Sequence, residues 1–212
     1  MYRHFLFDID GTLIDTERTG VLSLIKTVRE LMGVEMSYEE AYRFFGIPSG
    51  EAAPILGFAD HELFIARWEK NFVELQYLMR PFDGVMDVLV RLKESGAYIG
   101  CVTSRNRYEF SKDPYLQGMV HLFDVAICAE DTVKHKPDPE PVLEYMRRME
   151  ARLGERVLPG ECLYLGDTAH DFECCHGAGC DFALADWRCR GMQGIPANYR
   201  FTTAAELLDI ID

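Results

Sequence analysis

Two aspartates near the start of the chain, Asp8 and Asp10, are the first residues whose types and spacing suggest chemistry. They follow the apolar residues 5–7 and precede Gly11, so they stand where a short buried strand would end. Residues two apart in an extended strand point to the same face. Two carboxylates placed together repel each other unless a cation or a proton relieves them, which indicates a hard-metal site or an acid/base pair. The alternative is an ordinary turn or helix cap, because Asp, Gly and Thr favour turns.

Three further groups of polar residues could serve the same chemistry. Thr103 and Ser104 close an apolar run and offer hydroxyls and backbone amides to an anion. Lys136 stands before a proline, where restricted backbone freedom can hold its cation in a defined place. Asp167 and Asp171 are one helical turn apart, so their carboxylates can face the same point. Each group also has an ordinary explanation, namely a helix cap, a surface lysine or acids favoured by a helix dipole.

The spacing of apolar residues predicts the elements that must position these groups. Strands are expected at 5–7, 98–103, 123–128, 162–166 and 181–185, and helices at 85–95, 110–119, 139–153, from after 167 to about 179, and at 204–211. Pro114 should interrupt the helix at 110–119. Strands that alternate with helices predict an α/β fold with a doubly wound parallel sheet. Ligands bind at the carboxyl ends of such strands, so we expect the polar groups to meet at that edge.

A long helical block interrupts this alternation after the first strand. From about residue 16 to about 80 the apolar spacing is helical, and no segment reads as a strand. Ser37 with Glu40 has the spacing of a capping box, and Asp60 precedes another helix as an N-cap. We therefore predict a core domain of residues 1–15 and 82–212 and an inserted all-helical domain of residues 16–81.

The order of these motifs resembles that of the haloacid dehalogenase (HAD) superfamily. The pattern Asp8-x-Asp10-Gly-Thr-Leu is similar to the nucleophile motif of that superfamily. Thr103, the Lys136-Pro pair and the segment that begins at Gly166 follow in the order of the three remaining motifs, and the helical block falls where members carry a cap domain. The resemblance spans nearly the whole chain and implies a HAD-like Rossmannoid core with a helical cap. Dehalogenating relatives lack the second aspartate of the first motif, so the resemblance points to phosphoryl transfer, as in phosphoglycolate phosphatase-like members.

Carried onto this sequence, the resemblance assigns a role to each motif. Asp8 would be the nucleophile that forms an aspartyl-phosphate, and Asp10 would protonate the leaving oxygen and then deprotonate the attacking water. Thr103, Ser104 and Lys136 would bind the phosphoryl oxygens and oppose their charge.

The cofactor that the resemblance implies is Mg²⁺. It would be bound by a carboxylate oxygen of Asp8, the backbone carbonyl of Asp10 and the carboxylate of Asp167, with Asp171 as a further ligand or as a support for one. A metal is needed because an anionic nucleophile approaches a phosphate dianion only when charge is neutralised.

The inserted domain would close over the site and select the substrate. Thr16, Glu17 and residues 45–48 are candidates for substrate contacts, although hinge and turn roles explain them equally well. Few cations besides Arg43 lie near that segment, and no counterpart of the basic cap loop of sugar-phosphate mutases is evident. We therefore predict a phosphatase that acts on a small phosphomonoester. The alternatives are a phosphomutase of the sugar-phosphate type and a non-catalytic protein that binds a phosphate ligand.

The overall charge restricts the partners. The chain of 212 residues carries a formal net charge of -13, which argues against nucleic acid or an anionic membrane as partner. No apolar stretch has membrane-spanning length, and the first residues leave no room for a signal peptide. We expect a cytoplasmic protein whose partner is a small phosphorylated metabolite, and the sequence does not predict the oligomeric state.

Seven cysteines, an odd number, are expected to be reduced thiols. Six histidines and cysteines gather near the C-terminus and invite a zinc interpretation: His170, Cys174, Cys175, His176, Cys180 and Cys189. Their spacing lacks a paired Cys-x-x-Cys framework, so we expect these cysteines to act as small buried hydrophobic residues.

Overall fold

The computed structural model describes residues 2–45, 47, 49–189 and 194–211. The chain divides into two compact units. The core unit comprises Met1–Ile14 and Pro81–Asp212, and the helical unit comprises Asp15–Arg80.

The chain passes between the units through two short paired strands, β2 (Ile14–Asp15) and β3 (Arg80–Pro81). Within the core unit, the N–H of Phe82 donates to the carbonyl oxygen of Leu13 at 3.1 Å. The point at which the core unit's first segment ends therefore lies beside the point at which its second segment begins.

The core unit is built on a six-stranded sheet. Its strands are β1 (His4–Phe7), β4 (Tyr98–Val102), β5 (Val125–Ile127), β6 (Cys162–Gly166), β7 (Asp181–Ala185) and β8 (Tyr199–Phe201). All neighbours are parallel, in the order β5-β4-β1-β6-β7-β8, so β1 lies inside the sheet. Every residue of β1 and β6 is buried, as expected for parallel strands that are covered on both faces.

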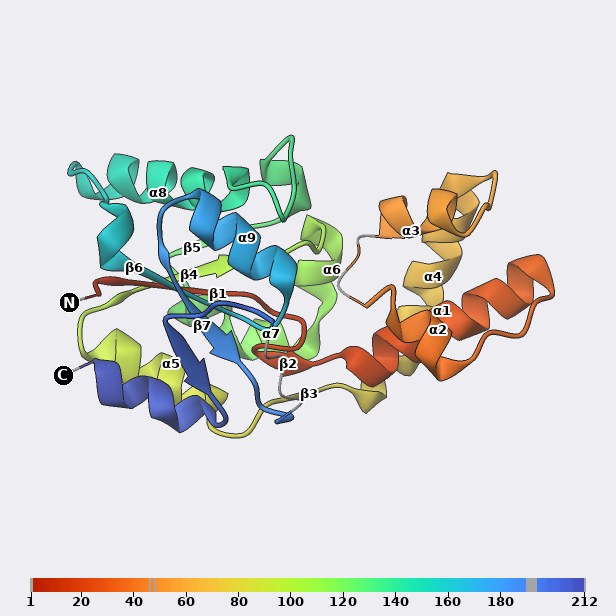
Figure 1. Ribbon diagram of the computed structural model, residues 1–212, viewed down its shortest axis with the longest axis horizontal. Helices are drawn as coiled ribbons and strands as arrows, with labels where there is room; N and C mark the ends of the chain where they lie inside the picture. The colour runs from red at the N-terminus through yellow and green to blue at the C-terminus, as the bar shows by residue number, and fades with distance from the viewer. Residues whose placement is uncertain (1, 46, 48, 190–193, 212) are drawn as a thin grey trace. The chain divides into compact units, whose positions relative to one another are not determined.

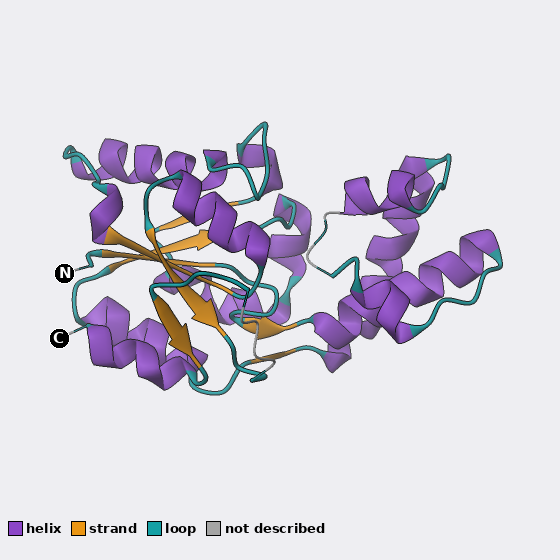
Figure 2. Ribbon diagram, in the orientation of Figure 1, coloured by secondary structure: helices purple, strands orange, loops and turns teal. Residues whose placement is uncertain are grey.

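Helices cover both faces of this sheet (Figure 2). They are α5 (Val85–Glu94), α6 (Arg107–Lys112), α7 (Pro114–Met119), α8 (Glu140–Leu153) and α9 (Ala169–Gly177), with short 3₁₀ segments η2 (Val120–Leu122), η3 (Ala129–Asp131), η4 (Pro159–Glu161) and η5 (Ala204–Ile210). In Figure 1, α8 and α9 lie on one face of the sheet, and α5 and η5 lie on the other. The predicted α/β fold with a doubly wound parallel sheet is therefore confirmed.

Three large aromatic side chains lie in the apolar core on the α8 and α9 side of the sheet. Tyr145 on α8, Tyr164 on β6 and Phe182 on β7 are all at most 1% exposed. Burying a side chain of this size contributes roughly 1.5–3 kcal/mol. The aromatic packing fixes β6, whose carboxyl end carries one of the predicted acidic motifs.

Several predicted elements differ from those observed. The segment 110–119 is two helices, as Pro114 led us to expect, and Asp113 caps the second by accepting from the N–H groups of Tyr115 and Leu116. Strand β5 is shorter than the predicted 123–128, and the closing helix is the 3₁₀ segment η5. Strand β8 was not predicted.

The helical unit contains α1 (Glu17–Met32), α2 (Tyr38–Tyr42), α3 (Ser49–Ile55), α4 (His61–Leu75) and the 3₁₀ segment η1 (Gln76–Leu78). The predicted capping box of Ser37 and Glu40 and the N-cap of Asp60 are both present. In its core, the indole N–H of Trp68 on α4 donates to the hydroxyl of Ser23 on α1 at 2.7 Å. None of the helices in the described parts of the chain combines the length and apolar character needed to span a bilayer.

Candidate active site

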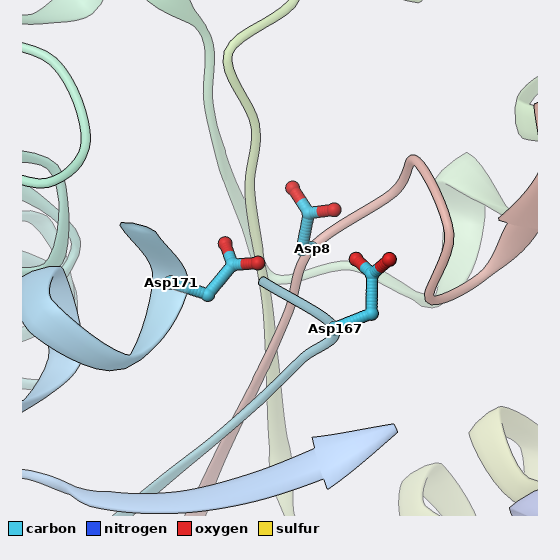
Figure 3. Close-up of side chains that lie close together, drawn as sticks. All are labelled: Asp8, Asp167 and Asp171. Atoms are coloured by element: carbon cyan, nitrogen blue, oxygen red, sulfur yellow. The ribbon is translucent and has the colours of Figure 1, made fainter. Parts of the chain in front are cut away.

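The acidic motifs converge at the carboxyl ends of β1 and β6. Asp8 follows β1 directly, and its N–H donates to the carbonyl oxygen of Leu165 on β6 at 2.9 Å. Asp167 follows β6, and Asp171 lies in the first turn of α9. One carboxylate oxygen from each of Asp8, Asp167 and Asp171 lies within 4.8 Å of the others, and Figure 3 shows the three side chains gathered around one point. Among the described residues, this is the one group of three or more acidic, histidine or cysteine side chains with such spacing.

Two glycines make this convergence possible. Gly11 has a φ of +87°, and a Cβ atom there would lie 2.1 Å from Oδ2 of Asp167. At Gly166 a Cβ atom would lie 2.6 Å from the Cβ of Asp171. Neither position has room for a side chain unless a neighbour shifts. Gly11 therefore allows the loop after β1 to lie against Asp167, and Gly166 allows the end of β6 to lie against Asp171.

Lys136 joins two of the three carboxylates. Its Nζ donates to Oδ1 of Asp8 at 2.6 Å and to Oδ1 of Asp171 at 2.7 Å, and it lies 5.4 Å from the centre of the Tyr164 ring. The lysine is buried, which by itself disfavours its charge, but Asp171 and Asp8 outweigh burial and raise the pKa of Lys136 above its ordinary value. Lys136 is therefore a fixed cation beside Asp8.

Both carboxylate oxygens of Asp171 accept hydrogen bonds. Besides Lys136, its Oδ1 lies 3.1 Å from the hydroxyl of Tyr164. Its Oδ2 accepts from both the hydroxyl and the N–H of Thr168. Burial opposes ionisation, but Lys136 and Thr168 hold the pKa of Asp171 below its ordinary value. Asp171 is thus an ionised anchor that fixes Lys136.

Asp8 and Asp167 remain crowded. Burial is the largest cause that raises the pKa of Asp8 to about 7; Asp171 and Asp10 add to it, and Lys136 opposes it. Burial and the carboxylates of Asp171 and Asp8 also raise the pKa of Asp167 well above its ordinary value. The hydroxyl of Thr12 donates to Oδ1 of Asp167 at 3.3 Å. Two acidic groups whose ionisation is disfavoured by burial and by each other form a site that a small divalent cation would stabilise.

Asp10 points to a cation of its own. Nε of Arg105 donates to Oδ2 of Asp10 and Nη2 donates to Oδ1, both at 2.8 Å. Nη1 of Arg105 donates to Oδ2 of the buried Asp113 at 2.7 Å. Burial disfavours the guanidinium charge, but Asp10 and Asp113 outweigh it and raise the pKa of Arg105. Each of these two carboxylates therefore has its own cation partner, which reduces the repulsion expected between Asp8 and Asp10.

Thr103 and Ser104 lie at the end of β4, next to β1 in the sheet. The N–H of Thr103 donates to the carbonyl oxygen of Ile127, and its hydroxyl accepts from the N–H of Arg105 at 3.1 Å. Thr103 is buried and Ser104 is partly exposed. The strand order thus brings all seven predicted site residues to one edge of the sheet.

Sequence reasoning missed Arg105, Asp113 and Tyr164. Arg105 directly follows Thr103 and Ser104, so its place at a strand end was a usable signal. Asp113 precedes Pro114, a pattern that is typical of a helix start. Nothing in the sequence around Tyr164 distinguishes it from other core residues.

The remaining predicted contacts lie outside the core unit. Thr16 and Glu17 are buried in the helical unit, and Oε1 of Glu17 accepts from the hydroxyl of Tyr38 at 3.0 Å. Of the predicted segment 45–48, Phe45 and Ile47 are partly buried, whereas Gly46 and Pro48 lie outside the described residues. Their contact with substrate stays a prediction.

The cysteines of the zinc interpretation differ in exposure. Cys174, Cys175 and Cys180 are buried, and Cys189 is exposed. The thiol of Cys175 lies 3.3 Å from the carbonyl oxygen of Cys180. The histidines His170 and His176 are exposed.

The fold and this arrangement of motifs define a class of protein. The sequence profile of the family described as haloacid dehalogenase-like hydrolase matches residues 5–185. The chain therefore belongs to that family, and the predictions of the superfamily and of a hydrolytic enzyme are confirmed.

Individual relatives agree with this assignment. The chain is 30% identical over 209 residues to the pyrophosphatase PpaX of Bacillus velezensis, covering 97% of this chain and 94% of the relative. A crystal structure of a candidate phosphoglycolate phosphatase from Lactobacillus plantarum superposes with a TM-score of 0.87 at 25% identity, covering 99% of each chain. CbbY of Rhodobacter sphaeroides, solved in complex with phosphate, shares the fold with a TM-score of 0.80 at 21% identity, covering 98% of this chain and 96% of CbbY.

Proposed function

We propose that this protein is a Mg²⁺-dependent phosphatase that hydrolyses a small phosphorylated metabolite through an aspartyl-phosphate on Asp8. The observation that carries the proposal is the position of Asp8. Its carboxylate lies at a strand end, 2.6 Å from the fixed cation Lys136 and within a cluster of acidic oxygens. Family membership and the names of PpaX and of the Lactobacillus protein support phosphate chemistry.

In the first half of the proposed reaction, a carboxylate oxygen of Asp8 attacks phosphorus. The bond between phosphorus and the ester oxygen breaks, and its electron pair goes to the leaving oxygen, which takes a proton from Asp10. Lys136, Thr103 and Ser104 would bind the equatorial phosphoryl oxygens and oppose the charge on them. The buried position of Lys136 supports this role, because a desolvated cation interacts more strongly than one in water.

In the second half, water attacks the phosphorus of the aspartyl-phosphate. Asp10, now a carboxylate, takes a proton from that water, and the bond between phosphorus and the Asp8 oxygen breaks. The products are free phosphate and the restored Asp8 carboxylate. The reaction thus needs Asp10 as an acid first and as a base afterwards.

The donor set fits Mg²⁺. Asp8 and Asp167 offer carboxylate oxygens, the ligand type that this ion prefers, and burial and the neighbouring carboxylates raise the pKa values of both. The backbone carbonyl of Asp10 would complete the protein's contribution. Both oxygens of Asp171 already accept hydrogen bonds, so we assign Asp171 the role of holding Lys136 rather than the metal. When bound, the ion would neutralise charge between the nucleophile and the phosphate.

The helical unit would act as the cap that selects the substrate and excludes water from the site. Its place in the sequence, between β2 and β3, supports this role, because cap domains of the superfamily are inserted at that point. The substrate class remains a small phosphomonoester, and pyrophosphate belongs in the test because PpaX relatives are named as pyrophosphatases. The chain's net charge of -13 supports a small ligand bound by local cations rather than a nucleic acid.

The test measures phosphate release from a panel of phosphomonoesters and from pyrophosphate, with Mg²⁺ or EDTA. Wild type should release phosphate from at least one panel member only with Mg²⁺, and Asp8→Asn should lose that activity because an amide is a poor nucleophile. Glu155→Gln is the matched control, since Glu155 is an exposed acid paired with Arg3, and should keep full activity.

Three results would contradict the proposal. Release that persists in Asp8→Asn would exclude the aspartyl-phosphate. A folded, Mg²⁺-loaded wild type that isomerises a sugar phosphate faster than it releases phosphate would be a mutase. One that binds phosphate esters without any turnover would be a binding protein.

A further inference from the structure

Arg105 is a buried cation whose contacts run directly to the proposed acid/base residue. It is 7% exposed, and three of its nitrogens donate to carboxylates. Two of these bonds grip both oxygens of Asp10 in the parallel, bidentate arrangement that restricts a carboxylate's direction as well as its position. A lysine could not reproduce this grip, because its single ammonium lacks the planar fork.

The other end of the guanidinium is also fixed. Asp113, which is 3% exposed, accepts from Arg105 through Oδ2, while its Oδ1 caps α7 through the N–H groups of Tyr115 and Leu116. The backbone of Arg105 is held as well, since its N–H donates to the hydroxyl of Thr103 and its carbonyl accepts from Ala129. A continuous set of hydrogen bonds therefore runs from the start of α7 to the carboxylate of Asp10.

We propose that Arg105, anchored by Asp113, is a positioning residue that holds the Asp10 carboxylate in the direction required to take a proton from the attacking water. The inference rests on the proposed function and assigns Arg105 to its second half. Both oxygens of Asp10 accept hydrogen bonds from Arg105, and a carboxylate whose oxygens act only as acceptors is arranged to accept a proton rather than to donate one. To deliver a proton in the first half, Asp10 has to loosen this grip, so Arg105 supports the hydrolysis of the aspartyl-phosphate more than its formation.

The proton and bond changes of this step balance without any further reactant. Water forms a bond to phosphorus, its proton moves to an oxygen of Asp10, and the bond between phosphorus and Asp8 breaks with its electrons returning to Asp8. Arg105 exchanges no proton in this step. Arg105 contributes by fixing the direction of the Asp10 carboxylate and by balancing its negative charge.

Steady-state kinetics with p-nitrophenyl phosphate distinguish a positioning role of Arg105 in the second half of the reaction from a general structural role. The leaving phenolate of this ester needs no proton, so formation of the aspartyl-phosphate does not depend on Asp10, and kcat/KM reports that first half. Slower hydrolysis of the aspartyl-phosphate then lowers kcat and KM together. For Arg105→Met we expect kcat to fall about 10–100-fold, KM to fall by a similar factor, and kcat/KM to stay within about threefold.

Acid-quenched enzyme should at the same time contain more phosphoenzyme in Arg105→Met than in wild type. Arg105→Lys, which keeps the charge and is the variant less prone to misfold, should recover part of the lost kcat. Arg148→Met is the matched control: Arg148 on α8 also joins two carboxylates, those of Asp131 and Glu144, but it is partly exposed and these partners lie outside the acidic motifs. Its kcat and KM should equal those of wild type.

A fall in kcat/KM at constant KM, or unchanged kinetics in both Arg105 variants, would overturn the inference. If wild type has no turnover, the proposed function fails, and a crystal structure of Arg105→Met decides the inference by itself. An Asp10 carboxylate that keeps its direction without Arg105 would overturn the positioning role, and one that turns away would support it.

Discussion

Replacing Gly11 with alanine should damage metal binding far more than stability. The new Cβ would lie 2.1 Å from Oδ2 of Asp167, and the backbone φ is +87°. A side chain at such a φ costs about 1–2 kcal/mol. The clash is with the end of a side chain, so the Asp167 carboxylate can rotate away, and its separation from the other acidic groups relieves their repulsion. The clash with Asp167 should therefore add little to the loss of unfolding free energy that the backbone conformation causes.

Gly96 provides the matched control for this substitution. Its φ is +85°, and a Cβ atom there would meet no other atom within 4 Å. Gly96→Ala should therefore show the backbone cost alone. Metal-free Gly11→Ala and Gly96→Ala should lose similar unfolding free energy, about 1–2 kcal/mol each.

Mg²⁺ should distinguish the two variants. With Asp167 displaced, we expect the Kd of Gly11→Ala for Mg²⁺ to rise at least about tenfold, while that of Gly96→Ala stays at the wild-type value. At about 100 times the wild-type Kd, the metal adds about 2.7 kcal/mol to the unfolding free energy of wild type and about 1.4 kcal/mol to that of Gly11→Ala. Urea unfolding with and without Mg²⁺ and calorimetric titration measure both quantities. A wild-type Kd in Gly11→Ala would refute the reasoning, because it would mean that Asp167 does not bind the metal.

Two other predictions address the buried cation and a buried histidine. Lys136→Met should lower kcat/KM by on the order of 10²-fold or more, because Asp8 and Asp171 lose the ammonium that lies 2.6 and 2.7 Å from them; activity within threefold of wild type would contradict the role of Lys136. Burial lowers the pKa of His4, so below about pH 6.5 the unfolded chain binds more protons than the folded protein and the unfolding free energy falls with falling pH. His4→Asn, which keeps a polar group near the hydroxyl of Tyr145, should show a flatter dependence between pH 7.5 and 5.5 in urea unfolding, and an unchanged slope would exclude His4 as the cause.

Most of the sheet could be predicted because buried parallel strands leave a simple signal. The run before Asp8 and the run 162–166 are continuously apolar and end at glycine or aspartate, and both are strands in the structure. Strand β8 left no such signal, because it has three residues and its central Arg200 is exposed. Its place in the sheet comes from pairing with β7, a long-range contact that local spacing does not encode.

The candidate site divides in the same way. Residues at strand ends could be placed together from the sequence, because parallel strands bring their carboxyl ends to one edge. The pairing of each cation with its carboxylate could not be predicted from the sequence. Arg105 reaches Asp10 from a loop far along the chain, and the bond is possible because β4 lies next to β1. That pairing depends on strand order, which the sequence pattern leaves open.

The hydrogen bond between Phe82 and Leu13 has a consequence for how this protein could change over time. Because the two segments of the core unit meet there, the chain between them is an insert whose two ends are held side by side. The entropy of closing such a loop grows only with the logarithm of its length, so doubling the insert costs about 0.6 kcal/mol. Inserts of different size and shape could occupy this position while the strand ends that carry the acidic residues keep their register. The helical insert and the strand ends that carry the acidic residues can then evolve as separate parts of the same chain.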